Sequence, residues 1–314
     1  MGLRVHSHPF FCPLFCIFAF DMSQLGYYLI IKPLSFLPLR LLHFFSTGLY
    51  YLFYFVVKYR RQVVARNLLH AFPQSTAAWR EHISRQFYRH LCDLIMESIK
   101  WFSISEQQAV KRCRIRNPEI LDQFFEQGKN VVIVGSHYGN WELTALIFPS
   151  QQKHQISSIF SNIKNKFIKE KITKSRGRYG SHLIPIPEVP AYFDLNHPRS
   201  VALAFIGDQV PAWDPKKNIY WTEFLNQETA VAMGAEKYAR KYDLPVVYVQ
   251  ILKQRRGYYE IELELVTDQP LTLQPYELTD RHLRMLERLI LGQPQFWLWS
   301  HRRWKYNKNG KPIH

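Results

Sequence analysis

Cysteine is scarce in this chain, with four in 314 residues and no Cys-x-x-Cys pair. The sequence therefore lacks the disulfide framework that holds small secreted scaffolds, and it has no cluster of cysteine and histidine at metal-ligand spacing. We expect free thiols in a reducing compartment, no metal site and no cofactor. The four cysteines are Cys12, Cys16, Cys92 and Cys113.

Acidic residues are also few relative to basic ones, with 25 Asp and Glu against 41 Lys and Arg, which gives a formal net charge of +16. An excess of this size indicates an anionic partner, which is a nucleic acid, a membrane surface or an acidic substrate. Zinc-finger spacing, a Gly-x-Gly-aromatic signature and basic heptads are all lacking, so nucleic acid has little support. We expect an anionic membrane surface and no nucleic acid.

Acidic and basic side chains are absent from residues 41–57, a run of 17 residues rich in Leu, Phe and Tyr. As a helix it would be about 25 Å long, just short of a comfortable membrane span. Lys58-Tyr59-Arg60-Arg61 follows, which favours a cytoplasmic position for the rest of the chain. We expect residues 22–60 to form a membrane anchor, as one tilted span or as a proline-broken pair of helices in one leaflet. The alternative, a buried amphipathic helix, is disfavoured because the run lacks a polar face.

Residues 1–21 have a different character. Residues 10–20 are similar to the apolar core of a signal peptide, with Arg4 before them, but Asp21 follows and there is no small-x-small cleavage site. We interpret residues 1–21 as an extension of the gene model and Met22 as the true start.

Strand-like and helix-like stretches alternate through residues 61–314. Residues 77–102 have apolar positions close to the 3.6-residue period of a helix. The later alternation predicts an α/β fold with a mixed, largely parallel sheet flanked by helices, and a hairpin at Arg256-Gly257. We expect one catalytic domain over residues 61–314, because no repeat or low-complexity linker divides it. The predicted strands are 130–134, 156–160, 183–186, 201–206, 220–224, 245–251 and 258–265, and the later helices are 141–148, 164–175, 230–242 and 279–291.

The most informative motif is His137-Tyr138-Gly139-Asn140-Trp141-Glu142, between a predicted strand and a predicted helix. A histidine at such a turn, with a carboxylate five positions on, can act as an oriented general base that takes a proton from a hydroxyl. A pair at this spacing also arises by chance. Gly135-Ser136-His137-Tyr138-Gly139 is similar to a Gly-x-Ser-x-Gly nucleophile elbow, but its central histidine disfavours a serine hydrolase.

This motif and four further blocks resemble the bacterial lipid A biosynthesis acyltransferases, relatives of the glycerolphosphate acyltransferases, which share a His-x-x-x-x-Asp/Glu centre. The blocks occur in family order, and the last is the most specific because it is long and rich in rare residues. The chain departs from the family pattern at Phe224-Leu225-Asn226. The blocks are Tyr59-Arg60-Arg61 with Asn67-Leu68 and Phe72-Pro73, then Arg176-Gly177-Arg178-Tyr179-Gly180, then Gly207-Asp208-Gln209, and finally Pro294 to Lys305.

The resemblance implies a glycerolphosphate-acyltransferase-like fold at the cytoplasmic face of a bacterial inner membrane. It implies transfer of a fatty acyl chain from acyl carrier protein, or from acyl-CoA, to a hydroxyl of a lipid A precursor. His137 would be the general base and Glu142 the carboxylate that orients it. Four further residues fall on substrate-binding positions, and they are Arg176, Asp208, Asn140 and Gln209.

Two of these positions leave alternatives open. The guanidinium of Arg176 suits phosphate, which lipid A precursors carry. Asp208 would position Arg176, His137 or a sugar hydroxyl, or be a plain turn residue. Two other functions also stay open, which are acyl transfer to another lipid (a lysophospholipid, glycolipid or aminolipid) and non-catalytic binding of membrane lipids.

Overall fold

The computed structural model describes residues 24–160, 165–193, 200–211 and 219–313. Their main element is a seven-stranded sheet with strand order β1-β9-β8-β2-β5-β3-β4. Neighbouring strands are parallel except for β8 and β9, which form an antiparallel hairpin. The predicted largely parallel sheet flanked by helices is confirmed. The strands are β1 Cys113–Ile115, β2 Val131–Gly135, β3 Gln155–Phe160, β4 His182–Pro185, β5 Val201–Ile206, β8 Val246–Arg255 and β9 Tyr258–Thr267.

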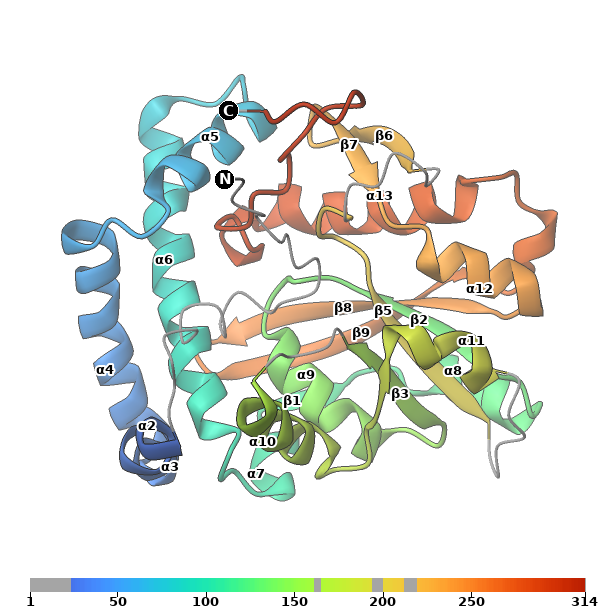
Figure 1. Cartoon of the computed structure of the whole chain (residues 1–314), viewed down its shortest axis with the longest axis horizontal. Helices are drawn as coiled ribbons and strands as arrows, with labels where there is room; N and C mark the ends of the chain where they lie inside the picture. Colours follow the sequence, from blue (N-terminus) through green and yellow to red (C-terminus); the bar gives the residue numbers. More distant parts are fainter. Residues whose placement is uncertain (1–23, 161–164, 194–199, 212–218, 314) are drawn as a thin grey trace, which may run out of the picture.

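Helices cover both faces of this sheet (Figure 1). On one face α9 packs with α10, and on the other α12 contacts β2 while α13 contacts β8 and β9. The long helix α6 lies beside the sheet, with α4 on its outer side. The helices are α2 Gln24–Gly26, α3 Lys32–Phe36, α4 Leu39–Tyr51, α5 Arg61–Ala71, α6 Ala77–Lys100, α7 Glu106–Val110, α8 Glu119–Glu126, α9 Trp141–Ile147, α10 Lys166–Gly177, α11 Val189–Phe193, α12 Gly234–Tyr242 and α13 Glu277–Gly292.

Strand β2 lies between β5 and β8, and all five of its residues are buried. A continuous apolar run with β-branched residues is typical of a parallel strand that is covered on both faces. The end of β2 is therefore fixed at the centre of the sheet, directly before the turn that contains His137.

The structure differs from the prediction between residues 220 and 242. A helix was expected over 230–242, but α12 begins only at Gly234, because Gln227–Val231 forms β7 and pairs with β6 Tyr220–Phe224. Leu225 and Asn226 turn this hairpin, and both have positive φ, as a two-residue turn between antiparallel strands requires. The departure from the family pattern at Phe224-Leu225-Asn226 lies at this turn.

The N-terminal segment, residues 24–57, folds as a series of short helices. Pro38 separates α3 from α4, and a π-helical turn, Leu52–Val56, follows α4. In the described part of the chain no single helix is long and apolar enough to cross a membrane. Leu39–Val56 and Arg61–Ala71, bent by 85°, meet the length and hydropathy criteria only as a pair. The anchor expected as one tilted span is therefore not present as one helix there, and the expectations for residues 1–21 and Met22 fall outside the described residues.

Helix α4 does have a polar face, contrary to the expectation, and that face points inward. His43 Nε2 lies 2.9 Å from Glu97 Oε1, and Ser46 donates to Asp93 at 2.5 Å, both acceptors being on α6. Apolar side chains point outward instead. The exposed apolar residues of the segment are Leu25, Tyr28, Leu29, Ile30, Phe36, Leu41, Phe44, Phe45, Tyr51, Leu52, Phe55, Val56 and Val57, which we call the N-terminal apolar face.

The turn after β2 requires glycine at position 139. Its φ is +64°, and an added Cβ would lie 2.7 Å from Cγ2 and 2.9 Å from the carbonyl oxygen of Ile251. We expect Gly139→Ala to lower the free energy of unfolding by about 2 kcal/mol, because the strained φ persists and the backbone contact cannot relax. Urea denaturation monitored by circular dichroism measures this change.

Gly48→Ala is the matched control, because Gly48 lies inside α4 with nothing within 4 Å of its added Cβ. Alanine in a helix interior should raise stability there by about 0.5–1 kcal/mol. Equal losses in the two variants would contradict the assignment of strain to position 139.

Candidate active site

His137 and Asp208 meet at the carboxyl ends of two adjacent parallel strands. His137 follows β2, Asp208 follows β5, and the register pairs Gly135 with Ile206 just before them. The carboxyl ends of neighbouring strands are where open α/β sheets carry their sites. The ring Nδ1 of His137 lies 2.7 Å from Asp208 Oδ1, and the backbone N–H of His137 donates to Oδ2 at 3.0 Å.

Asp208 is 4% exposed, and its carboxylate accepts a third hydrogen bond, from the indole N–H of Trp297 at 2.9 Å. Burial by itself raises the pKa of the Asp208 carboxyl. The charge of His137 and the hydrogen bonds from His137 and Trp297 outweigh that effect and lower the pKa to about 2. Asp208 is therefore a carboxylate at neutral pH and can only accept hydrogen bonds.

The second nitrogen of the His137 ring is available for proton transfer. Because Asp208 accepts at Nδ1, that nitrogen carries the hydrogen and Nε2 carries the lone pair. The side-chain nitrogen of Gln209 lies 3.2 Å from Nε2. Gln209 thus lies beside Nε2, the atom of His137 that can take a proton, and Asp208 contacts the other ring nitrogen, Nδ1.

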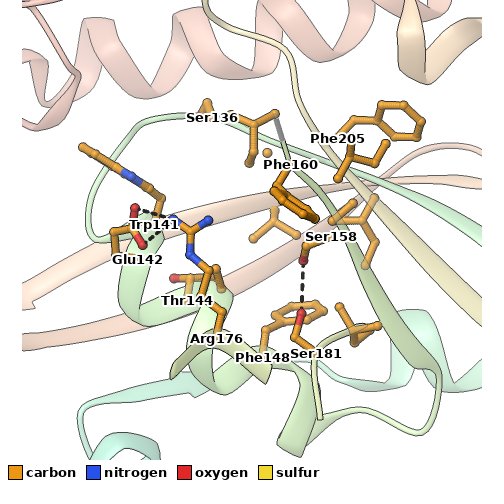
Figure 2. Close-up of a pocket in the computed structure, with 18 of the residues that line it drawn as sticks. Ser136, Trp141, Glu142, Thr144, Phe148, Ser158, Phe160, Arg176, Ser181 and Phe205 are labelled. Atoms are coloured by element: carbon orange, nitrogen blue, oxygen red, sulfur yellow. Dashed lines mark hydrogen bonds and ion pairs between the residues drawn. The ribbon is translucent and has the colours of Figure 1, made fainter. Parts of the chain in front are cut away.

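Glu142 does not take the role expected for it. It lies in the first turn of α9, and Nη2 of Arg176 contacts both of its carboxylate oxygens at 2.8 Å (Figure 2). Arg176 belongs to the last turn of α10, which packs against α9. The pairing of these two helices therefore brings Glu142 to Arg176, and the carboxylate at the His137 ring is Asp208.

The side chain of Asn140 makes hydrogen bonds to other groups of the protein. Its Oδ1 accepts from the backbone N–H of Leu143 at 2.9 Å, which caps α9, and its Nδ2 donates to Glu97 Oε2 at 2.6 Å. Asn140 has no exposed surface. In contrast to the substrate-binding position expected from the resemblance, its side chain fixes the start of α9.

Glu97 is a structural residue that sequence reasoning missed. It is fully buried on α6 and accepts hydrogen bonds from Asn140 and from the hydroxyl of Tyr259 at 2.9 Å, while His43 contacts its other oxygen. The one available signal was an acidic residue among the apolar positions of the predicted helix 77–102. Glu97 joins α4, β9 and the turn after His137 at one carboxylate.

A cavity of about 160 Å³ lies next to His137 on the face covered by α9 and α10. Most of its lining is aliphatic or aromatic, and Figure 2 shows Phe148, Phe160 and Phe205 around it. The hydroxyls of Ser158 and Ser181 lie 3.4 Å apart within the lining. His137, Glu142 and Arg176 also line this cavity, so polar groups and an apolar space meet at one place.

The C-terminal block packs into the protein around Asp208. Trp297 is 2% exposed, and its indole contacts Asp208, as described above. His301 accepts from the backbone N–H of Val210 at 3.4 Å, and burial lowers its pKa to about 3. Arg303 is 1% exposed and donates to the carbonyl of Ala230 at 2.7 Å.

Cysteine and metal-binding groups contribute little to the site. Cys92 and Cys113 are buried free thiols, and burial raises the pKa of Cys113 to about 12, whereas Cys12 and Cys16 lie outside the described residues. Within residues 24–160, 165–193, 200–211 and 219–313, no group of His, Cys, Asp and Glu side chains is placed to hold a metal ion.

A buried histidine–carboxylate pair next to an apolar cavity has the features of an α/β enzyme that acts on a lipid-like chain. The family model for the bacterial lipid A biosynthesis acyltransferases matches residues 19–306. A comparison with curated proteins finds no match. The chain therefore belongs to the bacterial lipid A biosynthesis acyltransferase family, and the resemblance inferred from its motifs is confirmed. It is an enzyme, an acyltransferase of lipid A biosynthesis.

The contacts of the two carboxylates predict different losses of rate. Asp208→Asn should lower kcat by about 10²- to 10⁴-fold, because an amide nitrogen can donate to Nδ1 and then favours the tautomer without a lone pair on Nε2. Glu142→Gln should lower kcat less, because its carboxylate contacts Arg176. Rates of acyl transfer by the two variants and wild type measure both effects.

The same rates distinguish the two possible partners of His137. A larger loss of kcat in Glu142→Gln than in Asp208→Asn would assign the orienting role to Glu142 instead.

Proposed function

We propose that the protein transfers a fatty acyl chain from acyl carrier protein, or from acyl-CoA, to a hydroxyl of a lipid A precursor, with His137 as the general base. The observation that carries this proposal is the 2.7 Å contact between His137 and Asp208 beside an apolar cavity. Membership of the family supports acyl transfer in lipid A biosynthesis. The donor, the acceptor and the base are our inferences from the chemistry of the site.

The proposed reaction is a direct attack without an acyl-enzyme. The acceptor hydroxyl loses its proton to Nε2 of His137, and its oxygen attacks the thioester carbonyl to form the new C–O bond. As the tetrahedral intermediate collapses, the C–S bond breaks and the imidazolium returns the proton to the thiolate. Asp208 stabilises the imidazolium, and the acceptor hydroxyl takes the place next to Nε2 that Gln209 occupies.

The donor chain would enter the cavity beside His137. The aliphatic and aromatic lining suits an acyl chain, because binding removes the apolar surfaces of both the chain and the cavity from contact with water. Arg176, held by Glu142 at this cavity, would contact a phosphate of the donor or of the acceptor. The net charge of +16 favours approach of an acidic carrier protein and of an anionic membrane.

The N-terminal apolar face would attach the protein to the cytoplasmic leaflet of the inner membrane. Thirteen exposed apolar side chains within residues 25–57 are an unusual concentration, and large exposed apolar surface marks membrane or protein contacts. Arg40 is exposed within this segment and Lys58 directly after it, and each can interact with anionic headgroups. The anchor was expected either as one tilted span or as a proline-broken pair of helices in one leaflet. The bend between the helices favours the second arrangement.

The catalytic proposal predicts the behaviour of His137→Ala. The variant should transfer acyl groups about 10²- to 10⁴-fold more slowly, because the hydroxyl loses its proton acceptor. The measurement uses labelled acyl carrier protein and labelled acyl-CoA as donors, with lipid A precursors, lysophospholipids, glycolipids and aminolipids as acceptors. His70→Ala, at an exposed histidine of α5, is the control and should match wild type.

Two results would count against the proposal in different ways. Wild-type transfer to another lipid but not to lipid A precursors would reject the acceptor. Equal rates in wild type and His137→Ala would reject the base.

Membrane attachment gives a separate prediction. The double variant Phe44→Ser, Phe45→Ser should bind anionic phospholipid vesicles at least about 100-fold more weakly, because each phenyl ring contributes about 1.5–3 kcal/mol on burial. Vesicle flotation measures the binding. Leu271→Ser is the control, because Leu271 is exposed outside the N-terminal apolar face, and equal binding by all three proteins would contradict attachment through this face.

A further inference from the structure

A second apolar cavity, of about 210 Å³, lies on the other side of the sheet. An apolar cavity of about 150 Å³ is large enough to bind benzene, so this one can hold part of an alkyl chain. Its lining comes from β2, β3 and β5 and from the helices of that face, and it includes Ala235 of α12 and His282 of α13.

The strand register separates the two cavities. Ile133 pairs with Ala204 and Val134 with Phe205, and partners in register point to the same face of a sheet. Ile133 and Ala204 line the first cavity, whereas Val134 lines the second. The first cavity also has lining residues from α9 and α10, Trp141 and Arg176, and the second has lining residues from α12 and α13, Ala235 and His282, so the cavities lie mainly on opposite faces.

The two cavities adjoin at the carboxyl ends of β3 and β5. His137 lines the first cavity, and Gly207, directly before Asp208, lines the second. The second cavity therefore ends at the residue that precedes Asp208, while His137 itself lines only the first cavity. The residues that line both cavities are Ile159, Phe205 and Ile206.

His282 is a polar group within the second cavity. Its side chain is 5% exposed, and it lines the cavity beside Ala235 and Gly207. Burial lowers its pKa to about 4, so the ring is neutral at neutral pH. A neutral imidazole offers one donor and one acceptor, which suits a hydroxyl on an otherwise apolar chain.

We propose that the second cavity binds an acyl chain of the acceptor lipid, while the first binds the chain of the donor. The two chains then approach His137 from opposite faces of the sheet. This assignment rests on the proposed function. The separate faces support it, because two bulky apolar substrates that must react together need separate places for their chains.

A pair of matched variants tests the assignment. Ala235→Leu extends a side chain into the second cavity and Ala145→Leu does so in the first. Because added methylenes in an apolar pocket change binding by about tenfold or more, Ala235→Leu should raise KM for the lipid acceptor and leave KM for the acyl donor unchanged. Ala145→Leu should do the reverse. Steady-state kinetics with a glucosamine-disaccharide lipid and acyl carrier protein thioesters measure both constants.

A photolabelling experiment tests the same point in the unmodified protein. An acceptor with a diazirine at the end of one acyl chain should label peptides of α12 and α13, whereas an acyl-CoA with a terminal diazirine should label α9 and α10. Labelling of α9 and α10 by both probes would overturn the proposal. This experiment decides the question even if Ala235→Leu fails to fold, which circular dichroism reveals.

A comparison of two acceptors tests whether His282 binds a hydroxyl on the acyl chain of the acceptor. Two acceptors that differ only by a hydroxyl on the acyl chain should differ in kcat/KM with wild type, and His282→Leu should abolish that difference. An unchanged preference in His282→Leu would overturn the role of the imidazole.

Failure of the inference can be told apart from failure of the proposed function. If wild type transfers no acyl chain to the disaccharide lipid, the proposed function is rejected. If wild type transfers it and Ala235→Leu has the same KM for the acceptor, only the second cavity is rejected.

Discussion

The hydrogen bond between His137 and Asp208 can form only because β2 and β5 are adjacent parallel strands in register. Each residue lies two positions after the last residue of its strand, so the sheet itself sets the distance between the His137 ring and the Asp208 carboxylate. Trp297 and the backbone of His137 then satisfy the second oxygen of Asp208. A carboxylate buried at 4% exposure needs all of these donors, because an unpaired buried charge is costly. The C-terminal block is thus as necessary to the pair as the two strands are.

A second buried carboxylate, that of Glu97, holds the surroundings of the pair in place. It accepts hydrogen bonds from the side chain of Asn140, which caps α9, and from the hydroxyl of Tyr259. Its other oxygen contacts His43 of α4. The N-terminal segment is therefore joined to the turn after His137 through one side chain. Asp93, one turn earlier on α6, accepts from Ser46 and Arg256 in the same way. The inner face of α4 therefore combines hydrogen-bonded polar side chains with the buried Leu42 and Tyr50, while apolar side chains such as Phe44 and Phe45 are exposed.

Much of the fold follows from the sequence, because β2 is a continuous apolar run and the histidine motif lies between a strand and a helix. Sequence alone leaves His137 as one of three possible partners of Asp208. It cannot select among them, because the choice depends on strand order, and β5 pairs with β2 although β3 comes between them in the sequence. Spacing along the chain favoured Glu142, whose direction is set by the packing of α9 on α10. Ala230 and Val231, the last two residues of β7, fit the apolar pattern of a strand and of a helix equally well. The predicted helix 230–242 therefore includes them, although α12 begins at Gly234. Three-residue β1 gives too short a pattern to detect.

The contacts of α4 have a consequence for the order in which the protein is made. Arg256 donates to the carbonyl oxygen of His43 from 213 positions further along the chain. During synthesis the N-terminal segment leaves the ribosome well before its hairpin partner exists, with both its polar and its apolar face uncovered. Under the proposed membrane attachment, the bilayer would cover the apolar face and act as an early folding partner. The partners of the polar face on α6, Asp93 and Glu97, follow about 50 positions later, whereas the contact with Arg256 forms only after the β8–β9 hairpin has been translated.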